Sequence, residues 1–227
     1  MHWLLVALLV IGVLFGPQLW VQRVMQRHSA PRTDFPGTGA ELARHLLNRF
    51  SLQQVAVDST DKGDHYDPAT RAVRLSEDHY QSRSLTAIVI AAHEVGHALQ
   101  DASDYPPLRW RHRLVGFANT AQQLGNILIL ATPIITAITR IPNTGLLLLI
   151  GGFASIGTAA LVHLITLPVE WDASFKRALP LLQAGNYLPA EDLPAARSIL
   201  RAAAFTYVAG ALASLLNLWR WARLVRR

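Results

Sequence analysis

The sequence predicts a mainly α-helical membrane protein, in which a bundle of about four transmembrane helices carries a small α+β domain at the membrane surface. Hydrophobic residues make up 51% of the 227 positions, and only 16% are charged, against about a quarter in ordinary soluble domains. Several long apolar stretches alternate with polar segments, as expected for membrane spans. The chain has no cysteine, which excludes a disulfide framework and thiolate metal ligands.

This alternation predicts five segments. They are an N-terminal transmembrane anchor (1–22), a polar domain (23–113), a transmembrane helical hairpin (114–168), a juxtamembrane segment (169–201) and a fourth membrane helix with a basic tail (202–227). The first segment lacks the positive start and the small-residue cleavage site of a signal peptide, so we expect the anchor to be retained.

The polar domain has the pattern of a small α+β fold. Residues 38–50 begin with a capping box of Thr38 and Glu41 and present one apolar face, which predicts a helix. Residues 52–57 and the second half of 64–76 predict short strands.

Four polar residues precede the second strand: Asp64, His65, Tyr66 and Asp67. One interpretation is a solvated turn. The other is a strand edge beside a cleft, where an extended peptide could add as a further strand. The residues alone favour the turn.

The strongest chemical signal is the His-Glu-Val-Gly-His sequence at 93–97, at the end of an apolar helical run. On an α-helix, His93 and His97 lie about 40° apart, so both imidazoles leave the same face. Two imidazoles at that spacing can bind Zn²⁺, and Glu94, on the flank, can act as general base. Gly96 allows another element to approach closely. The alternative is a core helix with two ordinary histidines.

A catalytic zinc site normally has a third protein ligand. Residues 114–139 and 145–168 predict two spans joined by a short turn, so the hairpin returns the chain to the same side of the membrane. Glu170 follows directly and is the favoured third ligand; His163, inside the span, and Asp172 are the rivals. Asp172 could instead accept a hydrogen bond from a ligand histidine. Both carboxylates could also merely balance neighbouring cations.

This residue set predicts peptide-bond hydrolysis by a zinc-activated water, with Glu94 taking the proton from the water and passing it to the leaving amine. The donor that stabilises the oxyanion stays open among five residues: Tyr66, Tyr105, Tyr207, His112 and Arg109.

Two other functions are open on the sequence alone. A membrane scaffold could hold zinc structurally and bind an adaptor partner without cleaving it; the sequence offers three good ligands and no obvious fourth, which favours the enzyme. An intramembrane protease of the site-2 type would place its motif within a span, but the apolar run 85–92 is too short to cross. Nucleic-acid binding is disfavoured because the Arg residues lie beside apolar segments.

Four blocks of the sequence, DHYDP with RLS, HEVGHALQ, LPVEWDAS and AAAFTYVAGAL, together resemble the YugP-like neutral zinc metallopeptidases, which are bacterial membrane proteins. The resemblance runs from about residue 38 to residue 218. It implies a zinc-dependent endopeptidase with a zincin-like catalytic domain next to the membrane. It makes His93, His97 and Glu170 the ligands and Glu94 the base, and it implies that the DHYDP block lies near the cleft. It implies no particular substrate.

The distribution of positive charge predicts which side of the membrane the site faces. Sixteen of the 21 Lys and Arg residues lie in 23–113 and 169–201. The positive-inside rule therefore predicts a multi-pass protein of the bacterial inner membrane, with a cytoplasmic catalytic domain and an external N-terminus. The Arg-rich tail disagrees with this rule if 202–219 spans fully. The expected partners are the lipid bilayer and a protein or peptide substrate.

Overall fold

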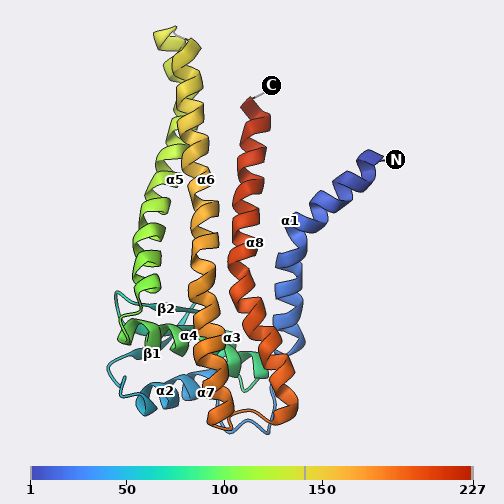
Figure 1. Cartoon of the computed structure of the whole chain (residues 1–227), viewed down its shortest axis with the longest axis vertical. Helices are drawn as coiled ribbons and strands as arrows, with labels where there is room; N and C mark the ends of the chain where they lie inside the picture. The colour runs from blue at the N-terminus through green and yellow to red at the C-terminus, as the bar shows by residue number, and fades with distance from the viewer. Residues whose placement is uncertain (1, 141, 226–227) are drawn as a thin grey trace. The chain divides into compact units, whose positions relative to one another are not determined.

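The computed structural model describes residues 2–140 and 142–225, which are mostly helical with one small sheet (Figure 1). Within these ranges, side chains are not described at 2–10, 13–14, 142–145, 147, 153, 155–157, 159–161, 163–164 and 213–225. The elements are α1 (His2–Arg27), α2 (Gly39–Arg49), β1 (Ala56–Thr60), β2 (His65–Asp67), β3 (Ala72–Ser76), α3 (Glu77–Tyr80), α4 (Leu85–Ala102), α5 (Pro106–Thr139), α6 (Pro142–Trp171), the π-helix η1 (Asp172–Ala178), α7 (Leu179–Ala184), the 3-10 helix η2 (Ala190–Asp192) and α8 (Leu193–Val225).

The chain forms two compact units. The first consists of the residues up to Pro17, Arg109–Leu167 and the residues from Tyr207 onward; the second consists of Gln18–Leu108 and Pro168–Thr206. The second unit therefore combines most of the predicted polar domain with the predicted juxtamembrane segment. It contains the sheet, α4 and the functional site.

One helix in the part of the chain that the structure describes, α5, is long and apolar enough to cross a membrane. It contains the predicted span 114–139. The other predicted spans, at 1–22, 145–168 and 202–219, include residues that lie outside the described side chains. The four-span bundle therefore stays a prediction.

The sheet of the second unit has the strand order β1-β3-β2. β1 pairs with β3 in parallel, and β2 pairs with β3 antiparallel. The central strand is the most buried, with Val73 and Leu75 fully inaccessible. β2 pairs on one side only among the described strands, so it is an edge strand of the sheet.

Two local predictions differ from the structure. The first strand begins at Ala56 rather than at residue 52, because Leu52 and Val55 turn back as buried residues beneath α2. Residues 65–67 form the strand β2 rather than the favoured solvated turn. At 52–55 burial beneath α2 outweighs the strand pattern, and at 65–67 pairing with β3 outweighs the turn signal.

The helix at 38–50 is confirmed as α2, with its capping box. The Thr38 hydroxyl accepts from the Glu41 amide at 3.2 Å, and the Glu41 carboxylate accepts from the Thr38 amide at 2.7 Å. α2 then packs its buried residues Ala43, Leu46 and Leu47 into the core that it shares with α4. The pairing of these two helices fixes one side of the domain.

The helix α4 runs through the centre of this core. Each residue from Leu85 to Ala98 is buried, and a helix that is apolar on every side belongs in an interior. Ser84 caps its first turn by accepting from the Ala87 amide at 3.1 Å. The Thr86 hydroxyl donates to the Met25 carbonyl at 2.9 Å, which ties the end of α1 to the start of α4. The motif histidines therefore stand on a rigid element.

Candidate metal centre

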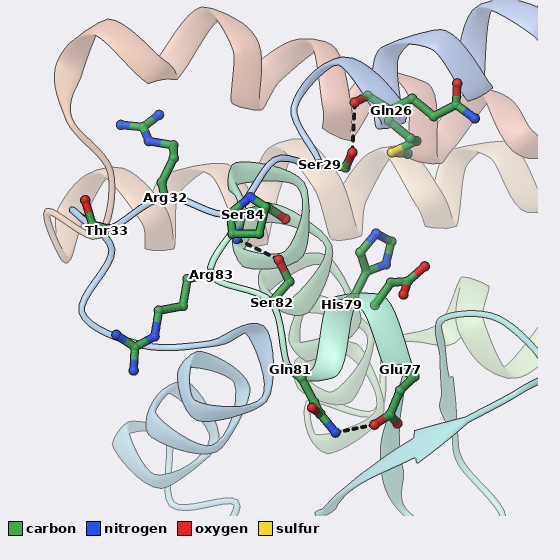
Figure 2. A pocket seen from close by; sticks show the side chains of 13 residues that line it. Gln26, Ser29, Arg32, Thr33, Glu77, His79, Gln81, Ser82, Arg83 and Ser84 are labelled. Atoms are coloured by element: carbon green, nitrogen blue, oxygen red, sulfur yellow. Dashed lines mark hydrogen bonds between the residues drawn. The ribbon is translucent and has the colours of Figure 1, made fainter.

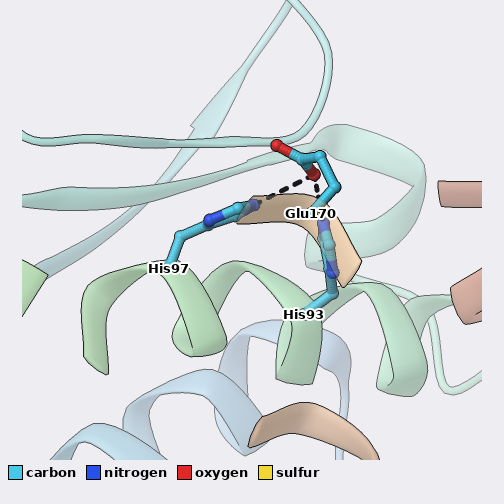
Figure 3. A group of neighbouring side chains, drawn as sticks. All are labelled: His93, His97 and Glu170. Atoms are coloured by element: carbon cyan, nitrogen blue, oxygen red, sulfur yellow. Dashed lines mark hydrogen bonds and ion pairs between the residues drawn. The ribbon is translucent and has the colours of Figure 1, made fainter. Parts of the chain in front are cut away.

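The three favoured ligands converge on one point inside the second unit (Figure 3). His93 and His97 project from successive turns of α4, and Glu170 comes from the last turn of α6. Glu170 Oε2 lies 3.3 Å from His93 Nε2 and 3.2 Å from His97 Nε2. All three side chains are buried. The last turn of α6 thus brings the glutamate beside the two histidines of the motif helix.

This donor set fits a zinc ion. Ligand atoms at about 2.05 Å from a tetrahedral centre lie about 3.3 Å from one another, and the two distances from Glu170 Oε2 are 3.2 and 3.3 Å. Imidazole nitrogen and carboxylate oxygen are common zinc ligands. The three ligand atoms lie within 4.8 Å of one another in a buried position, so one metal ion could contact all of them.

Hydrogen bonds at Nδ1 fix the tautomers of both histidines. His97 Nδ1 lies 2.9 Å from Gln100 Oε1; an amide oxygen only accepts, so this nitrogen carries the proton. His93 Nδ1 lies 3.1 Å from Ser174 Oγ, whose hydroxyl donates to the Leu200 carbonyl at 3.2 Å. That hydroxyl therefore accepts from His93. Both Nε2 atoms keep their lone pairs for a metal.

Asp172 does not reach a ligand histidine directly, because Gln100 lies between them. Gln100 Nε2 donates to Asp172 Oδ2 at 2.9 Å, and Arg177 Nε donates to the same oxygen at 2.9 Å. Burial raises the pKa of Asp172, but the hydrogen bonds from Gln100 and Arg177 outweigh it and hold the pKa below its ordinary value. Asp172 is therefore an anion at neutral pH. It pairs with Arg177, and Gln100 lies between it and the ligand His97.

The ligand segment approaches α4 very closely at Gly96. A Cβ atom at this position would lie 2.8 Å from the Ala173 carbonyl oxygen, closer than real Cβ contacts come. The segment after Glu170 is the π-helix η1, a rare conformation that is common at functional sites. The absence of a side chain at Gly96 thus lets this segment reach the motif helix, as the sequence analysis expects.

Glu94, the expected general base, lies on α4 next to His93 and is 6% exposed. The rival ligand His163 lies outside the residues whose side chains are described. Two polar residues that the sequence analysis did not assign, Gln100 and Ser174, are fully buried beside the ligands. Their spacing is the signal that could have found them: Gln100 follows His97 by three residues and Ser174 follows Glu170 by four, which places each on its ligand's helical face.

The DHYDP block contributes to the support of α4 rather than to the ligand set. Tyr66, in β2, donates its hydroxyl to Asp101 Oδ2 at 2.8 Å, and burial together with this carboxylate raises the pKa of Tyr66. His65 Nδ1 contacts the Gly63 carbonyl at 2.8 Å. Asp67 accepts hydrogen bonds from the next turn of its own chain. None of these contacts among the described residues reaches the metal group.

The five candidate oxyanion donors divide between the two units. Tyr66 and Tyr105 belong to the unit that contains the metal group, and Tyr207, His112 and Arg109 belong to the other. The Tyr66 hydroxyl already donates to Asp101. Tyr105 stacks under the Arg177 guanidinium, with 5.6 Å to the ring centroid, and burial raises its pKa. Tyr105 is therefore protonated at neutral pH.

A cavity of about 890 Å³ opens elsewhere in the second unit (Figure 2). Residues between 25 and 33 and between 77 and 84 line it, and the metal ligands are not among them. His79, on its wall, is held by Asp64 at 2.8 Å. Burial raises the pKa of Asp64, but the hydrogen bond from His79 lowers it below its usual range. This cavity is thus a feature separate from the metal group.

A buried helix that carries H-E-x-x-H, with a glutamate distant in sequence beside the two histidines, is typical of the class of zinc-dependent hydrolases. The sequence matches the family described as "Putative neutral zinc metallopeptidase" over residues 3–226, and the chain belongs to this family. It is 36% identical over 225 residues to "Putative membrane protease YugP" of Bacillus subtilis (strain 168), which covers 97% of this chain and 95% of that protein. The resemblance carried by the four sequence blocks is confirmed. No solved structure matches the chain.

Proposed function

We propose that the chain is a membrane-bound endopeptidase that hydrolyses peptide bonds with a zinc ion held by His93, His97 and Glu170. The convergence of these three buried side chains on one point carries the proposal. Zinc in such a site polarises a scissile carbonyl and makes water a nucleophile near neutral pH.

The chain's own residues supply the remaining chemistry. Glu94 takes the proton of the attacking water and passes it to the leaving amine. Its low exposure, 6%, keeps bulk water from competing for the carboxylate. The outer edge of β2 offers backbone groups to an extended peptide, and the Tyr66–Asp101 hydrogen bond joins that strand to the motif helix. The substrate class that follows is an extended protein segment.

Two observations favour the peptidase over its alternatives. A structural zinc site has four protein ligands, whereas the metal group found among the described residues has three, which leaves one position for water. A site-2-type protease would place its motif inside a span, but α4 packs with the sheet in the second unit. Among the residues that the structure describes, the helix with the length and hydropathy of a span is α5.

Removal of the metal tests this proposal. In detergent-solubilised protein, we expect a zinc chelator to reduce cleavage of unfolded casein on the order of 100-fold or more, and added Zn²⁺ to restore it, because the chemistry depends on the metal. An inhibitor of serine proteases serves as the matched control and should have no effect. Zinc-loaded protein that cleaves nothing would support the scaffold, and cleavage that persists after zinc removal would contradict a zinc peptidase.

We also propose that the protein is a multi-pass protein of the bacterial inner membrane with its catalytic domain in the cytoplasm. Because the chain has no cysteine, single cysteines can report sidedness. We expect Asp58→Cys, in β1, to react with a membrane-impermeant maleimide only after cells are opened, and Thr139→Cys, at the end of α5, to react in intact spheroplasts. The reverse pattern would place the active site outside.

A further inference from the structure

We propose that Gln100 is a positioning residue that joins His97 to the segment carrying Glu170, and so sets the geometry of the metal site. The inference rests on the zinc site of the proposed function. It concerns metal binding rather than cleavage, so the two can fail separately.

Both the oxygen and the nitrogen of the Gln100 side-chain amide are hydrogen-bonded. The side chain is 0% exposed. Its oxygen accepts from His97 Nδ1 at 2.9 Å, and its nitrogen donates to the Val169 carbonyl and to Asp172 Oδ2, both at 2.9 Å. Because an amide has two N–H donors and one carbonyl, these three bonds need both kinds of group in one side chain. While Asp172 is its partner, neither a carboxylate nor an apolar side chain can make all three bonds.

The partners of Gln100 bracket the third ligand. Val169 precedes Glu170 and Asp172 follows it by two residues, so the amide fixes the chain on both sides of the glutamate. Ser174, further along the same segment, accepts from His93 Nδ1. His97 is thus linked through Gln100, and His93 through Ser174, to the segment that follows Val169. The helix α4 and this segment are therefore joined at two points.

The two groups that accept hydrogen bonds from the histidine Nδ1 atoms, the Gln100 amide and the Ser174 hydroxyl, are neutral, and the Asp172 carboxylate contacts one of them, Gln100. Arg177 and Gln100 both donate to Asp172 Oδ2. A carboxylate in place of the Gln100 amide would face this oxygen and the Val169 carbonyl without a proton to share, and like charges in a poorly solvated site repel strongly. If position 100 carried the carboxylate and position 172 the amide, the net charge would stay the same and an N–H donor between the two side chains would be restored.

The experiment is a charge exchange, read as zinc affinity by competition with a chromophoric chelator. We expect Gln100→Glu to weaken zinc binding on the order of 10- to 100-fold, the range for changes in groups that orient metal ligands. We expect the double variant Gln100→Glu/Asp172→Asn to recover most of this loss. The recovery follows because the asparagine amide can donate to the new carboxylate while its oxygen accepts from Arg177. Gln53→Glu, at an exposed glutamine, is the matched control and should bind zinc as the wild type does.

A second variant distinguishes the loss of these hydrogen bonds from a general folding defect. Gln100→Met introduces no charge and removes all three hydrogen bonds; with its unfolding midpoint measured in the same buffer, we expect about a 10-fold weaker zinc affinity in the folded protein. Wild-type affinity in Gln100→Glu, or an exchange variant as weak as Gln100→Glu, would overturn the role of Gln100. Wild-type protein without zinc would instead overturn the zinc site on which the proposed function depends.

Discussion

Glu94→Gln is expected to lower kcat/KM for peptide cleavage by about 10²- to 10⁴-fold while the protein keeps about one zinc per chain, because the general base is lost but the ligands are not. The amide has the shape of the carboxylate but cannot take a proton. Glu94 is not one of the three converging ligands, so zinc content should not change. The measurement pairs steady-state kinetics with metal analysis of the same sample.

The matched control for this variant is Glu191→Gln, which makes the same change at an exposed glutamate in η2. It should retain full activity and full zinc. Undiminished cleavage by Glu94→Gln would contradict the assignment of the base. Loss of zinc together with activity would mean that Glu94 supports the ligand geometry rather than the proton transfer.

The parts of the site that the sequence predicts are those set by local geometry or by chain topology. The spacing of His93 and His97 is a property of any α-helix. Glu170 is predictable because a hairpin must return the chain to the side on which it started. Gly96 is predictable as a close-approach position, and the 2.8 Å that would separate its Cβ from the Ala173 carbonyl gives the reason.

The remainder depends on packing that spacing alone does not encode. The sequence allows Asp172 to accept a hydrogen bond from a ligand histidine directly, but in the structure Gln100 lies between Asp172 and His97 and bonds to both. The strand predicted at 52–57 begins only at Ala56 in the structure, because Leu52 and Val55 are buried beneath α2. Residues 65–67 pair with β3 although their sequence resembles a turn. In each case a tertiary contact decides between two locally acceptable conformations.

Glu170→Ala is expected to weaken zinc binding by more than about 100-fold, because it removes a ligand rather than a group that orients one. The side chain is 1% exposed, so a replacement ligand has no ready access from solvent. Zinc per chain, measured after dialysis against a weak chelator, should fall from about one to near zero. Glu191→Ala, the same truncation at an exposed site, should keep its zinc.

The comparison of Glu170→Ala with Gln100→Glu also separates ligands from supports. A ligand variant should need a larger increase in free zinc to regain occupancy than a support variant does. Full zinc retention in Glu170→Ala would assign the third ligand elsewhere, with His163 and Asp172 as the remaining candidates. Asp172 is the weaker of these because Gln100 and Arg177 already donate to one of its oxygens. Retention would therefore direct the next substitution to His163.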